Sequence, residues 1–297
     1  MYGAIVGDIV GSVYERRRDR IKTKEFPLFK DRSRLTDDSV LTIAVARALM
    51  RGYAEEREYA EILVEEMQRI GRQHLDAGFS DATKAWLLSD DPQPYGSCGN
   101  GAAMRVSPCG LMAVALEEAL ILAKATANVS HNHPEGVKGA QATAAAVYLA
   151  KEGKSKEEIA AYIRENFYPL DKTLDELRPV YQFDFTCQGS VPEAIQCFLE
   201  SESYEDAIRN AVSLGGDADT QAAIAGSIAW TYYLRRDGLL YQKPEMWPEE
   251  YKRLMREADS RMSEDERADI KRFREMWMYR EGAYDRIGMV RAIVKNR

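Results

Sequence analysis

Helical periodicity runs through almost the whole chain, and it constrains the fold more than any other feature of the sequence. Apolar residues recur every three or four positions in segments such as 40–49, 60–70 and 140–148, which is the spacing of one helix face. Alternating, strand-like runs are nearly absent. Further helices are predicted near residues 113–127, 156–166, 192–200, 204–213, 220–235 and 264–278. The sequence therefore predicts an all-α protein.

Local signals mark two helix starts and one change in composition. Pro134 suits the first position of a helix, and Ser155 with Glu158 forms a capping box. No linker rich in Gly and Ser divides the chain before about residue 237, so we predict one large compact domain over residues 1–248. Residues 249–297 are denser in charge and are predicted to form a helical extension packed on the core. A partner-binding face is the alternative for this extension.

Charge and cysteine content exclude several classes of protein. The chain has 41 Lys and Arg against 48 Asp and Glu, a net charge of −7, so its overall field repels a polyanion and no nucleic-acid partner is expected. Its four cysteines form no CxxC pair, which fits a reducing compartment. The apolar stretch 3–13 is interrupted by Asp8 and lacks a basic segment before it, and no apolar run reaches the roughly 20 residues of a membrane span. A soluble, cytoplasmic protein without a membrane partner is expected.

The first predicted helix carries two distinct stripes. One face of this helix carries three glycines, Gly3, Gly7 and Gly11. Because glycine has no side chain, another element can pack closely against this face. A polar stripe follows in the same segment, formed by Asp8, Ser12 and Glu15. For Asp8 we favour a hydrogen-bonded structural carboxylate. Glu15 either faces the run of arginines at 16–18 or has a chemical role.

Acidic residues gather at the starts of two predicted helices that are far apart in the chain. The clusters are Thr36-Asp37-Asp38-Ser39 and, after two glycines, Asp217-Ala218-Asp219-Thr220. An N-cap explains one side chain at each start. It does not explain neighbouring carboxylates, because a helix end offsets their repulsion by only about 0.3–1 kcal/mol per charge.

These two clusters together favour a metal site. If Asp37, Asp38, Asp217 and Asp219 converge, about four negative charges meet, and that is unfavourable unless cations neutralise them. Carboxylate and hydroxyl oxygens suit hard divalent ions, and the number of acids is compatible with two of them. Zinc is disfavoured, since the histidines near position 131 have no further His or Cys at ligand spacing.

A glycine-rich segment, YGSCGNGAAMR at 95–105, is the fourth signal. It is no Walker loop, because it lacks Gly-Lys-Ser/Thr, and no dinucleotide fingerprint, because Met104 stands where the third glycine would be. Its backbone N–H groups could form a nest for a diphosphate. Taken alone, however, the loop favours a surface turn without a ligand, and the nest is the alternative.

Taken in order, these motifs resemble those of the ADP-ribosylglycohydrolase family, the group that contains dinitrogenase reductase-activating glycohydrolase. The matching segments are GAIVGDIVGSVYE, TDDS, YGSCGNGAAMR, SHNHPEGVKGA, SVPEAI and GGDADT, and the resemblance as a whole covers about residues 3–248. The pairing of TDDS with GGDADT is highly specific. The resemblance gives no functional support to the segment beyond residue 248.

This resemblance implies an all-α fold with two Mg²⁺ or Mn²⁺ ions in a cleft, and hydrolysis of the bond between C1″ of ADP-ribose and an acceptor. The implied metal ligands are Thr36, Asp37, Asp38, Asp217, Asp219 and Thr220. Glu15 and Asp38 are the implied catalytic residues. Substrate binding is implied for Gly96, Ser97, Gly99, Asn100, Gly101 and His131, and we add Tyr95 and Met104. Cys98 departs from relatives with an aromatic residue that stacks on adenine, and Tyr95 is a candidate substitute.

Three other functions stay open from the sequence. The chain could be a non-catalytic ADP-ribose binder, or another two-metal hydrolase that cleaves a phosphoester of a nucleotide. It could also be a helical scaffold whose acidic helix starts are only caps. The acceptor is equally open, because an ADP-ribosylated arginine, serine, acyl ester or base presents the same ADP-ribose half. The expected substrates are therefore ADP-ribosylated proteins or small ADP-ribosyl conjugates.

Overall fold

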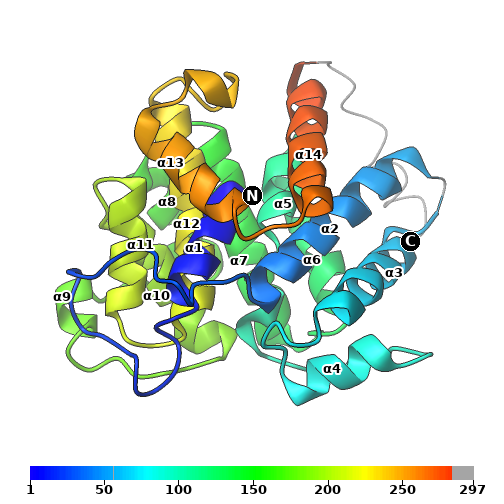
Figure 1. The fold of residues 1–297 in the computed structure, drawn as a ribbon, viewed down its shortest axis with the longest axis horizontal. Helices are drawn as coiled ribbons and strands as arrows, with labels where there is room; N and C mark the ends of the chain where they lie inside the picture. Colours follow the sequence, from blue (N-terminus) through cyan, green and yellow to red (C-terminus); the bar gives the residue numbers. More distant parts are fainter. Residues whose placement is uncertain (56, 283–297) are drawn as a thin grey trace.

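The computed structural model describes residues 1–55 and 57–282, and within these residues the regular structure is entirely helical (Figure 1). The prediction of an all-α protein is confirmed. The α-helices are α1 (Tyr2–Gly11), α2 (Asp37–Ala54), α3 (Tyr59–Gly71), α4 (Asp81–Leu88), α5 (Ser107–Met112), α6 (Leu116–Asn128), α7 (Pro134–Lys151), α8 (Lys156–Asn166), α9 (Leu174–Leu177), α10 (Cys187–Leu199), α11 (Tyr204–Ser213), α12 (Ala218–Arg236), α13 (Glu249–Asp259) and α14 (Glu264–Gly282). Three short 3₁₀ turns are η1 (Arg72–His74), η2 (Asn100–Ala102) and η3 (Pro244–Met246).

The centre of the molecule is the contact between α1 and α12, which lie side by side in Figure 1. The glycine stripe predicted on the first helix faces α12, and the two backbones touch. A Cβ atom on Gly7 would lie 2.1 Å from the carbonyl oxygen of Ala222, and one on Gly11 would lie 2.4 Å from that of Ala218. Glycine is required because any side chain would push the two helices apart. Helices α7, α10 and α11 pack against the other sides of α12.

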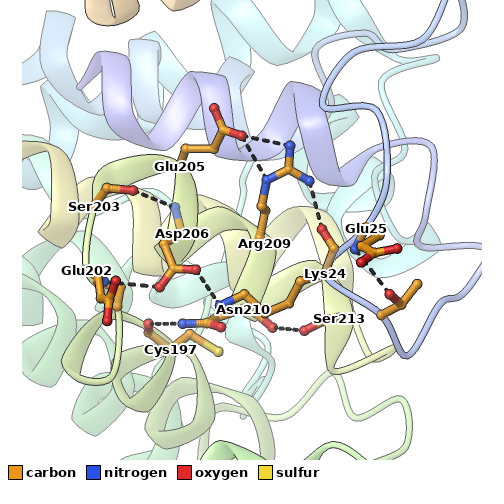
Figure 2. A network of polar contacts seen from close by, with 12 residues as sticks. Lys24, Glu25, Cys197, Glu202, Ser203, Glu205, Asp206, Arg209, Asn210 and Ser213 are labelled. Atoms are coloured by element: carbon orange, nitrogen blue, oxygen red, sulfur yellow. Dashed lines mark hydrogen bonds and ion pairs between the residues drawn. The ribbon is translucent and has the colours of Figure 1, made fainter.

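The long loop at 12–36, which joins α1 to α2, is fixed to α11 (Figure 2). Arg209 on α11 donates to the carbonyl oxygens of Lys24 and Phe26, each at 2.8 Å, and to Glu205 at 2.8 Å. The ammonium of Lys24 forms an ion pair with Asp206 on the same helix. These contacts hold a loop that has no regular structure of its own, so the residues at its two ends keep defined positions.

The C-terminal helices pack on the core through polar contacts as well as apolar ones. Arg47 on α2 pairs with Asp269 on α14, with Nη1 and Oδ2 2.5 Å apart. Arg280 pairs with Glu118 on α6 at 3.0 Å, and both side chains are almost fully buried. Residues 283–297 of the predicted extension lie outside the described residues. The division of the chain near residue 248 stays a prediction.

Several helix boundaries differ from the prediction. Pro134 does begin α7, and Ser155 with Glu158 does form a capping box at the start of α8. The helix predicted at 192–200 begins five residues earlier, at Cys187, and contains Pro192 in its interior. Its true start is set by Thr186, whose hydroxyl accepts the N–H of Gly189 at 3.2 Å. Helices α4, α5 and α9 are short and were not predicted. Among the described residues, no helix combines the length and the apolar character that crossing a bilayer requires.

Candidate metal and substrate site

A pocket of about 430 Å³ opens where the first turns of α2 and α12 meet the loops around residues 15, 97 and 184. Almost every residue predicted for the site lines it, although the chain separates them by up to two hundred positions. The predicted residues in its wall are Glu15, Thr36, Asp37, Asp38, Tyr95, Ser97, Gly99, Asn100, Gly101, Met104, His131, Asp217, Asp219 and Thr220. Gly96 is the predicted residue that does not line it.

The acidic starts of α2 and α12 touch one another at the base of the pocket. Thr36 caps α2, and the hydroxyl of Thr220 donates to Asp38 Oδ2 across the two helices at 3.3 Å. Asp217 occupies the N-cap position of α12, yet its side chain makes no cap bond. Its carboxylate accepts instead from the amide of Asn100 at 2.7 Å. The two helix starts therefore present carboxylates to one space, as the sequence predicted.

Two groups of three acids are close enough to hold a metal ion. In each group one carboxylate oxygen from each residue lies within 4.8 Å of those from the other two. Asp8, Asp38 and Asp219 form the first group, and Glu15, Asp217 and Asp219 form the second. Asp219 belongs to both. Asp37 lines the pocket but belongs to neither group.

Asp8 was predicted from the sequence as a hydrogen-bonded carboxylate but not as a member of an acidic group. It is fully buried and accepts from Thr36 N at 2.9 Å, from Thr36 Oγ1 at 2.6 Å, from Ser39 N at 3.1 Å and from the Ser39 hydroxyl. The hydrogen-bonded role that we favoured is confirmed, and Asp8 also joins the first acidic group. The predicted helical stripe through Glu15 is wrong, because α1 ends at Gly11 and Glu15 enters the pocket from the loop.

The electrostatics of the site fit a divalent cation. Burial raises the pKa of Asp38 and of Asp219, and neighbouring carboxylates raise both further. Burial is also the main cause that raises the pKa of Asp37, to about 7. Asp38 Oδ1 is buried without a hydrogen-bond partner among the described residues. An orphaned carboxylate oxygen among crowded acids is the donor set that hard divalent ions prefer.

The opposite end of the pocket is formed by aromatic and glycine residues. The rings of Tyr95 and His131 meet edge to face with centroids 5.4 Å apart, and the Tyr95 hydroxyl lies 3.1 Å from that of Thr83. A Cβ atom on Gly101 would lie 2.9 Å from His131 Nε2, so a side chain there would displace the imidazole. Glycine at this position lets the histidine ring lie against the loop.

Three backbone N–H groups of this loop already donate to acceptors within the protein, so they cannot contribute to an anion-binding nest. Gly96 N donates to the side chain of Asn132 at 2.9 Å, and Gly99 N donates to Ser97 Oγ at 3.0 Å. Asn100 N donates to the carbonyl of Phe185 at 2.7 Å. These groups hold the loop in place and are not free for an anion. Two of the three acceptors, Asn132 and Phe185, come from other segments, which the sequence of the loop alone does not reveal.

Two aromatic residues of the pocket were missed from the sequence. Phe185 and Phe183 line the pocket from the loop between α9 and α10, with 59% and 37% of their surface exposed. The guanidinium of Arg20 lies 4.4 Å from the centre of the Phe183 ring. The signal was present as YQFDF at 181–185, since exposed aromatic residues concentrated in a polar loop indicate a binding surface.

The fold and the site define a helical protein with an acid-lined pocket, and comparison with known proteins identifies its family. The ADP-ribosylglycohydrolase family model matches residues 1–235. The chain therefore belongs to the ADP-ribosylglycohydrolase family, and the resemblance inferred from its motifs is confirmed. The match ends at residue 235, before the limit near 248 that the motifs suggested. At the level of the family, the prediction of a glycohydrolase enzyme is confirmed.

Individual relatives are distant but cover most of the chain. ADP-ribosylhydrolase ARH3 of Homo sapiens is 27% identical, over 82% of this chain and 86% of the relative. ADP-ribosylarginine hydrolase Tri1 of Pseudomonas putida is 26% identical, over 78% of this chain and 69% of the relative. A solved structure, described as an ADP-ribosylglycohydrolase-related protein complex, has a TM-score of 0.65 with 22% identity and covers 94% of both chains. That likeness shows a shared fold.

Proposed function

We propose that the chain is a metal-dependent hydrolase that cleaves the C1″ glycosidic bond between ADP-ribose and an acceptor, with two Mg²⁺ or Mn²⁺ ions in the pocket. One observation carries the proposal: two acidic groups that share Asp219 lie at a pocket large enough for a nucleotide-sized ligand, and all their members except the buried Asp8 line its wall. Membership of the family supports the class of reaction. A scaffold with acidic caps has no need of such a pocket.

Oxygen donors from three segments would hold the ions. The proposed ligands are Thr36, Asp37, Asp38, Asp217, Asp219 and Thr220, and the two acidic groups add Asp8 and Glu15 as candidates. Bound ions would orient the hydroxyls of the distal ribose and make a water molecule more acidic. The charges of the acids would then be neutralised, which removes their mutual repulsion.

Glu15 is the residue best suited to move a proton. It is partly exposed in the pocket wall, and burial, assisted by the charge of Asp217, raises the pKa of its carboxyl. Its carboxyl could give a proton to the departing acceptor atom as the bond to C1″ breaks. Positive charge develops at C1″ at the same time, and carboxylates nearby would stabilise it. Asp38 remains the second catalytic candidate.

The far end of the pocket has the chemistry to bind the rest of ADP-ribose. Ser97 and His131 offer polar groups there, beside Gly99, Gly101 and Met104 in the same wall. The amide of Asn100 lies next to the acids, where it donates to Asp217. For the adenine we propose Phe185, because an exposed phenylalanine at the rim presents a flat apolar face to a purine. Tyr95 is less suited than predicted from the sequence, since its ring already packs against His131 and its hydroxyl is bonded to Thr83.

Release assays on defined linkages test the proposal. The protein is freed of metal with a chelator, supplied with Mg²⁺ or Mn²⁺, and incubated with ADP-ribosylarginine and ADP-ribosylserine peptides and with O-acetyl-ADP-ribose. Mass spectrometry should detect intact ADP-ribose from at least one substrate, only when metal is present. Absence of release from all of them contradicts the proposed reaction. Products with a cleaved diphosphate would favour a phosphoester-type hydrolase, and tight ADP-ribose binding without turnover would favour a reader.

Matched variants test the assignment of residues. Asp38→Ala and Asp217→Ala should abolish release while the protein stays folded by circular dichroism. Glu193→Gln is the control, because burial also raises the pKa of Glu193, to about 7, but this acid lines a different cavity. It should retain the rate of the natural protein. Phe185→Ala should raise KM for ADP-ribosyl substrates with little change in kcat, and Phe185→Tyr should restore the lower KM.

A further inference from the structure

Arg105 lies beneath the pocket end that contains His131, and no function has been assigned to it above. Its side chain is completely buried, and Nη2 donates to the carbonyl oxygen of Thr126 at 2.9 Å and to Ser130 Oγ at 2.8 Å. Among the described residues no carboxylate lies within ion-pair distance of it. A buried guanidinium without an acidic partner is unfavourable for stability. This cost points to a role for Arg105 in the function of the pocket and not in the stability of the fold.

Ser130 connects this guanidinium to the histidine. Its Oγ atom lies 2.8 Å from Nδ1 of His131 and accepts from Arg105 on another side. A serine hydroxyl has one hydrogen, and arginine cannot accept one. If His131 Nδ1 carried a proton, that N–H would point at Ser130 Oγ and the serine hydrogen would lack an acceptor. Every hydrogen in this network has an acceptor when Nδ1 carries no proton and accepts a hydrogen bond from the serine hydroxyl.

We propose that Arg105 and Ser130 are positioning residues that hold His131 as the neutral tautomer with its proton on Nε2, so that the ring presents a hydrogen-bond donor to the pocket. Nε2 faces the Gly99–Gly101 turn and has no hydrogen-bond partner among the described residues. Its N–H would be satisfied by an oxygen of the ligand. This assignment rests on the proposed function, in which the oxygen belongs to the phosphates or the distal ribose of ADP-ribose.

The surroundings of His131 support the neutral form. Burial lowers the pKa of His131 well below its usual value, and the charge of Arg105 lowers it further. Burial also lowers the pKa of Arg105, to about 10, so the guanidinium stays protonated at neutral pH. The edge of Tyr95 covers another side of the ring. The pocket wall thus combines the acids with a neutral donor that has a buried cation behind it, and this donor suits an oxygen of an anionic diphosphate.

Nitrogen NMR of the imidazole rings tests this proposal without reference to catalysis. The chain has three histidines, His74, His131 and His133, so their long-range proton–nitrogen correlations can be assigned by single substitutions. His131 should show a protonated Nε2 and an acceptor Nδ1 at pH 7. An Nδ1–H tautomer or a charged ring at that pH in the natural protein would overturn the proposal.

Two serine variants separate positioning from simple packing. Ser130→Ala should allow the Nδ1–H tautomer to appear and should weaken ADP-ribose binding in calorimetry roughly three- to tenfold, the loss of one net hydrogen bond. Ser107→Ala is the matched control, because Ser107 is also buried and its hydroxyl has no partner among the described residues. It should change neither result. An unchanged tautomer in Ser130→Ala overturns the proposal, whereas natural protein that shows the predicted tautomer but does not bind ADP-ribose overturns the proposed function instead.

Discussion

Gly7→Ala is the most informative single change, because Gly7 lies where the backbones of α1 and α12 touch. The new Cβ atom would lie 2.1 Å from the carbonyl oxygen of Ala222 and 2.5 Å from the carbonyl carbon. Ordinary contacts begin near 3.4 Å, so α12 must retreat by about 1.3 Å at this point. Both partners are main-chain atoms of helices, so no rotamer change can relieve the clash.

The expected loss of stability follows from two opposing effects. Alanine is favoured over glycine inside a helix by about 1 kcal/mol. Overpacking a core costs about 1–3 kcal/mol, and we take the upper end because the obstacle is backbone. The net effect is a loss of about 2 kcal/mol. The entropy of unfolding is about 2.1 cal/mol/K per residue, so for a chain of this length Tm falls by about 3 °C.

Calorimetry of the metal-free protein measures this shift. Gly71→Ala is the matched control, since a Cβ there would meet only the movable methyl groups of Leu87, the nearest at 2.7 Å. Its stability should stay within about 1 kcal/mol of the natural protein, because the gain in helix propensity offsets a small repacking. Because α1 carries Asp8 and α12 carries Asp219, Gly7→Ala should also reduce the Tm increase produced by Mn²⁺. A Tm for Gly7→Ala equal to or above that of Gly71→Ala would refute this reasoning.

Three further outcomes follow from buried charges. Asp38→Asn removes a crowded negative charge, so in thermal scans with chelator its Tm should be at least equal to that of the natural protein. With an ion present at 100 times its Kd, the natural protein should gain about 2.7 kcal/mol of stability, and the variant should lose this gain. Burial raises the pKa of Asp37 and of Glu193 to about 7, so the folded chain binds more protons than the unfolded chain between about pH 4 and pH 7. Denaturant titrations of the metal-free protein should therefore show stability falling as pH rises through that range, and a rise would contradict these shifts. Glu118→Gln leaves the buried charge of Arg280 without its carboxylate and should cost about 3 kcal/mol in urea unfolding, with no change if the pair is dispensable.

Periodicity and short motifs were enough to predict the helical fold and most of the pocket. Helices with strong start signals, such as α8 with its capping box, begin where expected. The start of α10 was wrong because its cap, Thr186, precedes a stretch without clear apolar spacing. Convergence of the acids could be predicted because capping explains only one side chain at each helix start. A cation shared between the two starts would account for the remaining carboxylates.

Other parts of the site depend on contacts that sequence spacing does not encode. The place of Asp8 in an acidic group appears only when the end of α1 and the starts of α2 and α12 are brought together. Phe185 reaches the pocket because its carbonyl binds Asn100 N, an interaction between segments 85 residues apart in the chain. The chain from Arg105 through Ser130 to His131 likewise joins residues whose separation carries no periodic signal.

The N-cap position of α12 has a consequence for the proposed binding of a cation. Asp217 stands where a capping side chain is expected, but the helix does not use it, and Asn100 keeps the carboxylate in place. If Asp217 holds a cation as we propose, uptake and loss of that cation would leave the N-terminal turn of α12 in place.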